Sequence, residues 1–571
     1  AERGERVPVF IVCLARPELL ERRPSWSGGR RNATNLDLEP LRQDEAEQLV
    51  AALGSKGLTP AAVTMIAQRA GGNPLFVEEL VRMMMEGTAP GSQIPDTVQA
   101  VLTARIDRLP QSERRVLQAA SVIGRTFWPS AVATIAGISN QDTTPALRDL
   151  IAKELIVPRP VSTLGDEREY AFRHILTRDV AYGMIPKAQR QRAHAETARW
   201  LETRLGDRVE EVIEILAEHM RMADADRAVE YLHRAANKAR RLYANVDALR
   251  FFDHAIAAAR RVALPSQRVA EILRDRGDVH QLRGEYQAAM ADFDEALGLA
   301  RESGDRAAQA VLESRVGLVF HRQLKLSDAE THYRRAADIA RAEGNRAVLG
   351  QSLVDLANIA WDRGSIDPDD PSFSEGIALL RDAGDRSALS RGLNMLAMSH
   401  LRVGNGEAAI AAADEALTTA QEAGDKSKEA TSLSYLTVIN MYLGRYADAI
   451  RYGRPALALA REIEDRRREA YTMDFVARVQ LSVGVWGEAV QLMEDSLPLM
   501  RLYAPGHVPW GLLMLGIAYD EIGDPERAKP YLEECMAIET ASASFWQPIV
   551  VARAMVAKLG QDRTLLARVI E

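Results

Sequence analysis

The side chains that most often carry out catalysis form no recognisable constellation in this sequence. No grouping of serine, cysteine or carboxylate residues indicates a nucleophile with its base, and the ten histidines show no zinc-ligand spacing. The phosphate-binding loop GxxxxGK(S/T) is absent, and the dipeptide Gly-Lys does not occur. Without that loop there is no nest of backbone N–H groups for phosphates and no lysine or hydroxyl to organise Mg²⁺. This chain alone is therefore not expected to hydrolyse ATP.

A pattern that recurs every 40 residues organises most of the chain. An opening glycine is followed by small or apolar residues at plus 5, plus 9 and plus 12, offsets that share one helical face. Such a fixed period predicts stacked helical units instead of one closed core. The opening positions are Gly284, Gly364, Gly404, Gly444 and Gly484, with Leu324 in the same register and Gly523 one residue early. The closing pairs are Gly304-Asp305, Gly344-Asn345, Gly384-Asp385, Gly424-Asp425 and Glu464-Asp465. The packing positions include Ala289, Phe293, Ala296, Ala329, Tyr333, Ala336, Ala409, Ala413, Ala416, Ala489, Met493 and Ser496.

The unit that Gly364 opens departs from this pattern. Pro368 and Pro371 prevent an ordinary helix start, and Asp369 stands where the packing alanine is expected. We expect an irregular second helix that begins near Ser372. The alternative interpretation is an acidic ligand loop.

Composition bounds the class of protein. With 571 residues and 47% hydrophobic residues, the chain is long enough for several domains. Its 72 Lys and Arg are interspersed with 80 Asp and Glu, for a net charge of −8, so no nucleic-acid partner is expected. Cys13 and Cys535 lie in apolar settings and indicate a reducing compartment without disulfides. With no signal peptide or membrane span recognisable, we expect a cytoplasmic protein without a membrane partner.

The chain enters almost directly into the apolar run VFIVCLA at residues 9–15. Such a run predicts a buried strand of a parallel sheet, yet no partner strands follow it. We therefore expect this sequence to be a fragment of a longer protein whose N-terminal part is left out.

Several motifs together resemble a known family. They are LARPELL, then RAGGNPLFVEELVRMM, then IPDTVQAVLTARIDRLPQSERRVLQAASVIGRTF, then YAFRHILTRDVAYGMIPKAQRQRAHAETARWLE. In this order they resemble the distal half of STAND-class AAA-type ATPases, especially bacterial regulators in which a nucleotide cyclase or another effector precedes the ATPase. The 40-residue units after them resemble long tetratricopeptide (TPR) repeats. The resemblance covers residues 7–205 and then the array.

The resemblance implies a mainly α fold with a remnant of an α/β NTPase core. In order, it implies the end of that core at 1–40, a helical lid domain at 41–108, a winged-helix domain at 109–205, a helical connector at 206–263, and a TPR superhelix with C-terminal capping helices at 264–571. The helix expected to be the third of the winged helix carries balanced charges, Arg148 and Lys153 beside Asp149 and Glu154. This balance favours a domain-locking role over DNA binding.

The resemblance also implies a nucleotide site for ATP or ADP, with Mg²⁺ held through the missing N-terminal part. Arg16 matches the arginine that senses the terminal phosphate, and Gly72, Asn73 and Pro74 match the glycine-x-proline element whose proline packs on adenine. His174 matches a winged-helix histidine that reports on the diphosphate. Each match has a structural alternative: a surface arginine before a turn, a helix cap and turn, and a structural histidine at a strand-to-helix junction.

Three hypotheses for function follow. The first is the sensor and switch part of a nucleotide-dependent signalling ATPase, in which a protein or peptide on the concave TPR face biases an ATP/ADP switch controlling an N-terminal effector in cis, possibly a nucleotide cyclase. The second is a non-enzymatic TPR scaffold for protein–protein interaction. The third is a TPR-containing transcriptional activator, although no helix-turn-helix motif is recognisable near Glu571.

Overall fold

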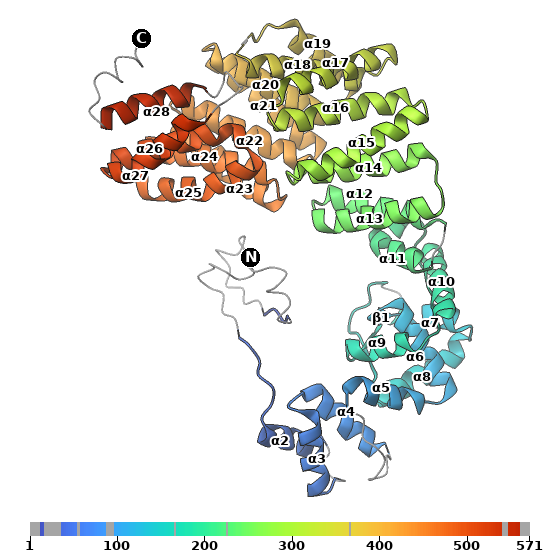
Figure 1. The fold of residues 1–571 in the computed structure, drawn as a ribbon. Helices are drawn as coiled ribbons and strands as arrows, with labels where there is room; N and C mark the ends of the chain where they lie inside the picture. The colour runs from blue at the N-terminus through green and yellow to red at the C-terminus, as the bar shows by residue number, and fades with distance from the viewer. Residues whose placement is uncertain are drawn as a thin grey trace. The chain divides into compact units, whose positions relative to one another are not determined.

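The computed structural model describes residues 12–15, 36–53, 58–86, 96–164, 167–223, 226–364, 367–538 and 546–559 (Figure 1). The chain divides into two compact units, Ala1–Thr197 and Ala198–Glu571. Within the described ranges the structure is mainly α-helical, as predicted. None of the helices described there has both the length and the apolar character required to cross a membrane.

Four helices form the first part of the first unit. They are α2 (Gln43–Leu53), α3 (Pro60–Ala70), α4 (Pro74–Met85) and α5 (Val98–Asp107). Each of the last three has a side-chain N-cap, because Thr59, Asn73 and Thr97 accept a backbone N–H from the first turn. Their apolar faces meet in a core that includes fully buried Val50 and Leu80.

Helices and a small sheet form the rest of the first unit. They are α6 (Gln111–Ile123), β1 (Thr126–Phe127), α7 (Pro129–Ala136), α8 (Asn140–Ala152), β2 (Ile156–Pro158), β3 (Tyr170–Phe172) and α9 (Ile175–Gly183). The antiparallel sheet has the order β1-β3-β2, with Phe127 opposite Tyr170 and Val157 opposite Ala171. α10 (Lys187–Leu205) spans the boundary between the units. The assignment of this region as a winged helix stays a prediction.

The expected N-terminal strand is not formed by the residues that the structure describes. Residues 12–15 have no strand assignment, and Val12 and Leu14 are 68% and 90% exposed. An apolar run is buried as a parallel strand only when neighbouring strands accept its hydrogen bonds, and the described part of the first unit offers only the three short antiparallel strands. The expectation of a buried strand is therefore wrong for these four residues.

The second unit is a stack of consecutive helices (Figure 1). They are η2 (Gly206–Val212), α11 (Ile213–Ala223), α12 (Ala228–Arg241), α13 (Asn245–Arg261), α14 (Ser266–Leu282), α15 (Tyr286–Glu302), α16 (Arg306–Arg322), α17 (Leu326–Ala342), α18 (Arg346–Asp362), α19 (Pro371–Ala383), α20 (Arg386–Arg402), α21 (Gly406–Ala423), α22 (Lys426–Tyr442), α23 (Tyr446–Glu462), α24 (Arg466–Ser482), α25 (Trp486–Tyr503), η3 (Pro505–His507), α26 (Val508–Ile522), α27 (Pro525–Ala537) and α28 (Trp546–Leu559). The predicted helical-repeat array is thus present.

A left-handed residue ends nearly every helix of the array. The opening and closing glycines of the pattern have φ between 64° and 92°, and Leu324 and Glu464 adopt φ of 61° and 58° in the same positions. Glycine reaches this region without steric cost, whereas another residue pays about 1–2 kcal/mol. The chain therefore reverses direction at the spacing that the sequence pattern predicts.

The packing positions are buried as the offsets predict. All twelve residues at plus 5, plus 9 and plus 12 named above are 0% or 1% exposed. Each even-numbered helix from α14 to α24 also contacts the next even-numbered helix. These helices therefore lie close together along one side of the array, which makes that side the concave one.

The irregular unit keeps its packing through glycine. α19 begins at Pro371, with Asp370 as its N-cap, one residue before the predicted start. At plus 12 it carries Gly376, where a Cβ atom would lie 2.9 Å from the carbonyl oxygen of Gly350 on α18. A Cβ on Gly350 would in turn lie 2.8 Å from the carbonyl oxygen of Gly376. Two backbones thus approach each other directly, which only glycine permits.

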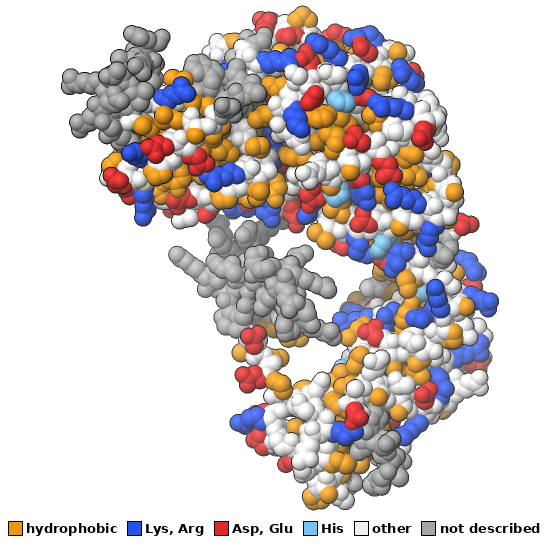
Figure 2. Space-filling model, in the orientation of Figure 1, with side chains coloured by type: hydrophobic (Ala, Val, Ile, Leu, Met, Phe, Trp, Pro, Cys, Tyr) orange, Lys and Arg blue, Asp and Glu red, His pale blue; other side chains and the backbone are white. Residues whose placement is uncertain are grey.

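The charges at the surface are mixed, in agreement with the composition. Figure 2 shows Lys and Arg side chains interspersed with Asp and Glu over the helices of the array on the face drawn. Many form pairs between neighbouring helices, such as Arg260 with Glu295 at 2.8 Å and Arg381 with Glu415 at 2.7 Å. Exposed pairs of this kind contribute about 0–1 kcal/mol each.

Gly376→Ala should destabilise the array locally. The added methyl group meets the backbone of Gly350 and must push α18 and α19 apart, so we expect a loss of about 1–3 kcal/mol in the local opening free energy. Hydrogen exchange of the α18 and α19 amides measures it. The matched control is Gly298→Ala in α15, where a Cβ has open space, and which should stabilise its helix by about 0.5–1 kcal/mol. Equal behaviour of the two variants would contradict the close contact.

Candidate functional site

The predicted glycine-x-proline element lies between α3 and α4. Gly72 has φ 78°, and a Cβ atom there would lie 2.5 Å from the carbonyl oxygen of Leu41. The N–H of Leu41 donates to the carbonyl oxygen of Gly72 at 2.8 Å, which ties the segment before α2 to this turn. Asn73 caps α4 by accepting the N–H of Phe76 at 3.2 Å. Pro74 is the first residue of α4 and is exposed, so its ring is accessible to a ligand.

The structure brings His174 close to the first turns of α4. His174 directly precedes α9, and its Nε2 lies 3.4 Å from Oε2 of Glu78. Glu78 follows Pro74 by four residues and therefore shares its side of the helix. The His174 motif, 100 residues after Pro74 in sequence, thus lies next to the first turns of α4, whereas Arg16 lies outside the described residues.

An ion-pair cluster fixes this arrangement. Arg82 of α4 pairs with Glu78 and with Glu154, which follows α8. Arg173 lies 3.4 Å from Glu78 and 3.2 Å from Glu154. Two arginines and two carboxylates thus alternate between α4 and the segments that follow α8 and β3, so the segment bearing His174 is held against α4.

A second, buried ion pair lies next to this cluster. Arg105 of α5, 3% exposed, pairs with Glu79 of α4, 1% exposed, and with Glu86. Burial by itself lowers the pKa of Arg105, but Glu86 and Glu79 raise it above its ordinary value. Arg105 also donates to the carbonyl oxygen of Lys153 at 3.2 Å. This charge must stay paired, because removal of one partner from a buried pair costs about 3–5 kcal/mol.

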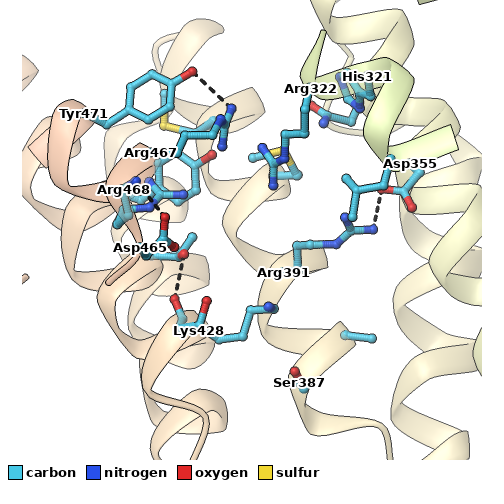
Figure 3. A pocket seen from close by; sticks show the side chains of 18 of the residues that line it. His321, Arg322, Asp355, Ser387, Arg391, Lys428, Asp465, Arg467, Arg468 and Tyr471 are labelled. Carbon is cyan, nitrogen blue, oxygen red and sulfur yellow. Dashed lines mark hydrogen bonds and ion pairs between the residues drawn. The ribbon is translucent and has the colours of Figure 1, made fainter. Parts of the chain in front are cut away.

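A large hollow lies inside the array, on its concave side. Its volume is about 1550 Å³, and its walls come mainly from the even-numbered helices α14 to α24 (Figure 3). Cationic, aromatic and apolar side chains line it together. The lining includes Arg322, Asp355, Met395, Met398, Lys428, Tyr435, Arg467, Arg468, Tyr471 and Trp510.

The lining residues recur with the period of the array. Asp385, Asp425 and Asp465 cap α20, α22 and α24, and the residues at plus 2, 3, 6, 10 and 13 after each cap line the hollow. The sequence pattern predicted the concave face and identified the three aspartates. It did not predict the lining residues at plus 2, 3, 6, 10 and 13, because the predicted offsets describe only the buried packing face. The inner helices carry a second periodic set, and that set is the signal that was overlooked.

Positive charge exceeds negative charge in this lining. Ten Lys or Arg side chains face six Asp and no Glu, although acidic residues are in excess over the whole chain. All six aspartates are already engaged. Three are the helix caps Asp385, Asp425 and Asp465, and three pair with His321, Arg315 and Arg391.

Contacts between distant parts of the array close the hollow. The hydroxyl of Tyr243 accepts the N–H of Ser427 at 3.1 Å, and Nδ2 of Asn245 donates to the carbonyl oxygen of Ile463 at 3.2 Å. Arg283 pairs with Glu464 at 3.1 Å, and Tyr286 donates to the carbonyl oxygen of Tyr503 at 3.4 Å. These partners are 181 to 218 positions apart. We call this set of four contacts the clasp.

Two protein-family models match parts of the array. The model of anaphase-promoting complex subunit 5 matches residues 215–321 and 391–443, and a tetratricopeptide repeat model matches residues 511–541. The second match falls on α26 and α27, a helix pair of the kind that the pattern predicts. No curated protein matches the chain.

Several solved structures resemble the chain at low identity. A Signal Transduction ATPase with Numerous Domains (STAND) protein with a tetratricopeptide repeat sensor, from Pyrococcus horikoshii, is 14% identical over 94% of this chain and 76% of its own, with a TM-score of 0.47. A Rap protein complexed with Competence and Sporulation Factor is 12% identical over 65% of this chain and 98% of its own, with a TM-score of 0.45. The Rap conjugation gene regulator of plasmid pLS20, in complex with the Phr* peptide, is 13% identical over 56% and 92%, with a TM-score of 0.41.

Breaking the clasp should open the array. The double variant Asn245→Ala and Arg283→Ala removes one hydrogen bond and one ion pair, worth together about 1–2 kcal/mol. We expect faster hydrogen exchange of the Ser427 amide and a larger radius of gyration by small-angle X-ray scattering. The control Arg260→Ala removes the Arg260–Glu295 pair between neighbouring helices and should change neither quantity. An unchanged Ser427 amide in the double variant would show that the clasp does not hold the array closed.

Proposed function

We propose that this chain is the sensor and switch part of a nucleotide-dependent signalling ATPase. In this proposal the array binds a protein or peptide partner in its hollow, and the first unit contributes nucleotide contacts through Arg16, the Gly72-Asn73-Pro74 turn and His174. The phosphate loop, the Mg²⁺ ligands and an effector such as a nucleotide cyclase would lie in a preceding part of a longer protein.

The observation that carries the sensor role is the clasped hollow. A volume of about 1550 Å³ exceeds the 300–1,000 Å³ typical of small-molecule sites and suits a peptide segment. Four contacts between distant repeats close the array around this space, and each contributes about 0.5–1.5 kcal/mol to the closed form. A partner that binds only the closed array can shift the equilibrium between closed and open arrays, which is what a sensor requires.

The arrangement around α4 supports the nucleotide part of the proposal. Pro74 is exposed at the start of α4, and His174, which precedes α9, lies 3.4 Å from Glu78 one turn further along α4, so two of the predicted nucleotide-contact residues lie near the same end of this helix. The Glu78–Arg82–Glu154–Arg173 cluster would then transmit a change at one of these residues to the other. The non-enzymatic scaffold remains the second candidate, favoured by the absence of a phosphate loop from this sequence.

Pro74→Ala should weaken nucleotide binding in the longer protein that carries the phosphate loop. Loss of the ring removes the proposed packing surface for adenine, and we expect about a tenfold higher Kd for ADP, or about 1.4 kcal/mol. Isothermal titration calorimetry measures it. Pro129→Ala is the matched control, because Pro129 is also the first residue of a helix, α7, and has no proposed ligand role. Equal affinities for the two variants would remove Pro74 from the site.

Met398→Trp should block peptide binding by filling the hollow. Met398 lines the hollow without being fully buried, so the larger ring is expected to extend into the open space. Random-sequence peptides displayed on phage are selected on the immobilised 571-residue chain and then tested on the variant. We expect enriched peptides that the variant no longer retains. Retention of the same peptides by Met398→Trp would place their site outside the hollow, and a lack of enrichment would favour the alternative that the partner is a folded protein.

A further inference from the structure

Four cations of the hollow, all on helices α16, α22 and α24, have no carboxylate partner in the described structure. They are Arg322 at the end of α16, Lys428 in the first turn of α22, and Arg467 and Arg468 in the first turn of α24. None of the four lies within ion-pair distance of a described carboxylate, in contrast to Arg315 and Arg391 of the same hollow. In Figure 3, Arg322 and Lys428 point into the same open space, and Arg467 and Arg468 lie on the wall opposite Arg322. We call these four residues the cation cluster.

Arg468 is the most constrained member of the cluster. It is 7% exposed, and its Nε has no hydrogen-bond partner. Its guanidinium lies 5.4 Å from the ring centroid of Tyr435 and 5.8 Å from that of Tyr471. Aromatic faces attract a cation, but they leave its N–H groups unsatisfied. A buried guanidinium in this state carries a desolvation cost that an anionic ligand would offset.

The other three members of the cation cluster are Arg467, Arg322 and Lys428. Arg467 lies 4.7 Å from the ring centroid of Tyr471 and donates to its hydroxyl at 3.1 Å, with no acidic partner. Burial and the neighbouring Arg467 and Arg391 lower the pKa of Arg322 to about 10. Burial also lowers the pKa of Lys428, although Asp425 acts in the opposite direction. Arg322 and Arg467 therefore repel each other, and negative charge between them would relieve that repulsion. Burial acts to lower the pKa of Arg467, but its neighbours, Tyr471 first among them, raise it above its ordinary value.

The chemistry of the remaining lining points to a peptide instead of a small anion. Met395, Met398 and Val438 offer apolar surface between the charged positions, and the amide of Asn358 can both donate to and accept from a peptide backbone. The cluster draws on three helices, α16, α22 and α24. An extended chain with carboxylates on separate side chains matches both the volume and the distribution of charge.

We propose that the hollow selects acidic peptide segments, whose carboxylates pair with Arg322, Lys428, Arg467 and Arg468 while neighbouring apolar side chains lie against the methionines and tyrosines. This inference rests on the proposed function, because it names the class of partner that the array senses. The carboxylates of such a segment would bind Arg322 on one wall and Arg467 and Arg468 on the other. The bound segment would thereby connect the two walls and add to the closure that the clasp provides.

The test is the residue composition of peptides selected on the complete 571-residue chain from a random display library. We expect enrichment of Asp and Glu over the starting library. A synthetic copy of the best peptide should bind, by fluorescence anisotropy, at least about tenfold more tightly than its twin with Asn and Gln in place of Asp and Glu. The difference should shrink as salt is raised.

Charge variants assign the effect to the cluster. Lys428→Gln and Arg467→Gln should each weaken the acidic peptide about tenfold while leaving the affinity for the neutral twin unchanged. Circular dichroism checks that each variant is folded. Lys428→Arg should retain the affinity, and Arg260→Gln, outside the hollow, serves as the control.

The outcomes separate this inference from the proposed function. Enriched peptides that are neutral or basic, or that bind Arg467→Gln as well as the wild type, would overturn the acidic preference but leave peptide sensing intact. Enrichment of no peptide at all would overturn the acidic-peptide inference and would favour a folded protein as the partner that the array senses. Micromolar binding of pyrophosphate that depends on the cluster, together with no peptide enrichment, would replace the peptide by a small anion.

Discussion

The array depends on one constraint, the direct approach of helix backbones at positions that allow nothing larger than a small side chain. Gly350 and Gly376 show the limit, since a Cβ on either would lie within 3 Å of the other's carbonyl oxygen. Elsewhere the same role falls to alanines that are completely buried, such as Ala289 and Ala416. Because this spacing and the left-handed reversals are set by the sequence at a constant interval, every repeat is rotated against the last by a similar amount.

The rotation between successive repeats adds up along the array. It brings residues about 200 positions apart into contact, where Asn245 bonds to Ile463 and Arg283 pairs with Glu464. Glu464 is one of four residues of the second unit that adopt a left-handed conformation without being glycine, the others being Tyr243, Ala263 and Leu324. The Glu464 side chain pairs with Arg283, and this contact offsets part of the backbone cost of about 1–2 kcal/mol. One departure from glycine in the repeat pattern thus lies at the clasp.

Local features of the sequence predicted the fold because the contacts that determine them lie within one repeat. The 40-residue step, the buried offsets and the shortened helix after Pro371 each depend on neighbours close in the chain. The hollow and the clasp could not be predicted in this way, since both depend on the summed rotation of many repeats. Net charge was also uninformative about the hollow, because an overall value of −8 is compatible with a cationic interior when the acidic residues lie outside. For the first unit, the motifs identified Pro74 and His174 separately, whereas their common link to Glu78 and α4 depends on tertiary packing.

The cation cluster and the clasp both act on the opening and closing of the array. The clasp joins the turns around Tyr243 and Arg283 to helices α22 to α25, and the cluster sets Arg322 of α16 opposite Arg467 of α24. Without a ligand, repulsion across the hollow would oppose closure, whereas the clasp favours it. A bound anion replaces the repulsion between the two walls by attraction, because it pairs with cations on both walls. Its affinity then differs between open and closed arrays, and that difference is the free energy with which a partner can drive a switch.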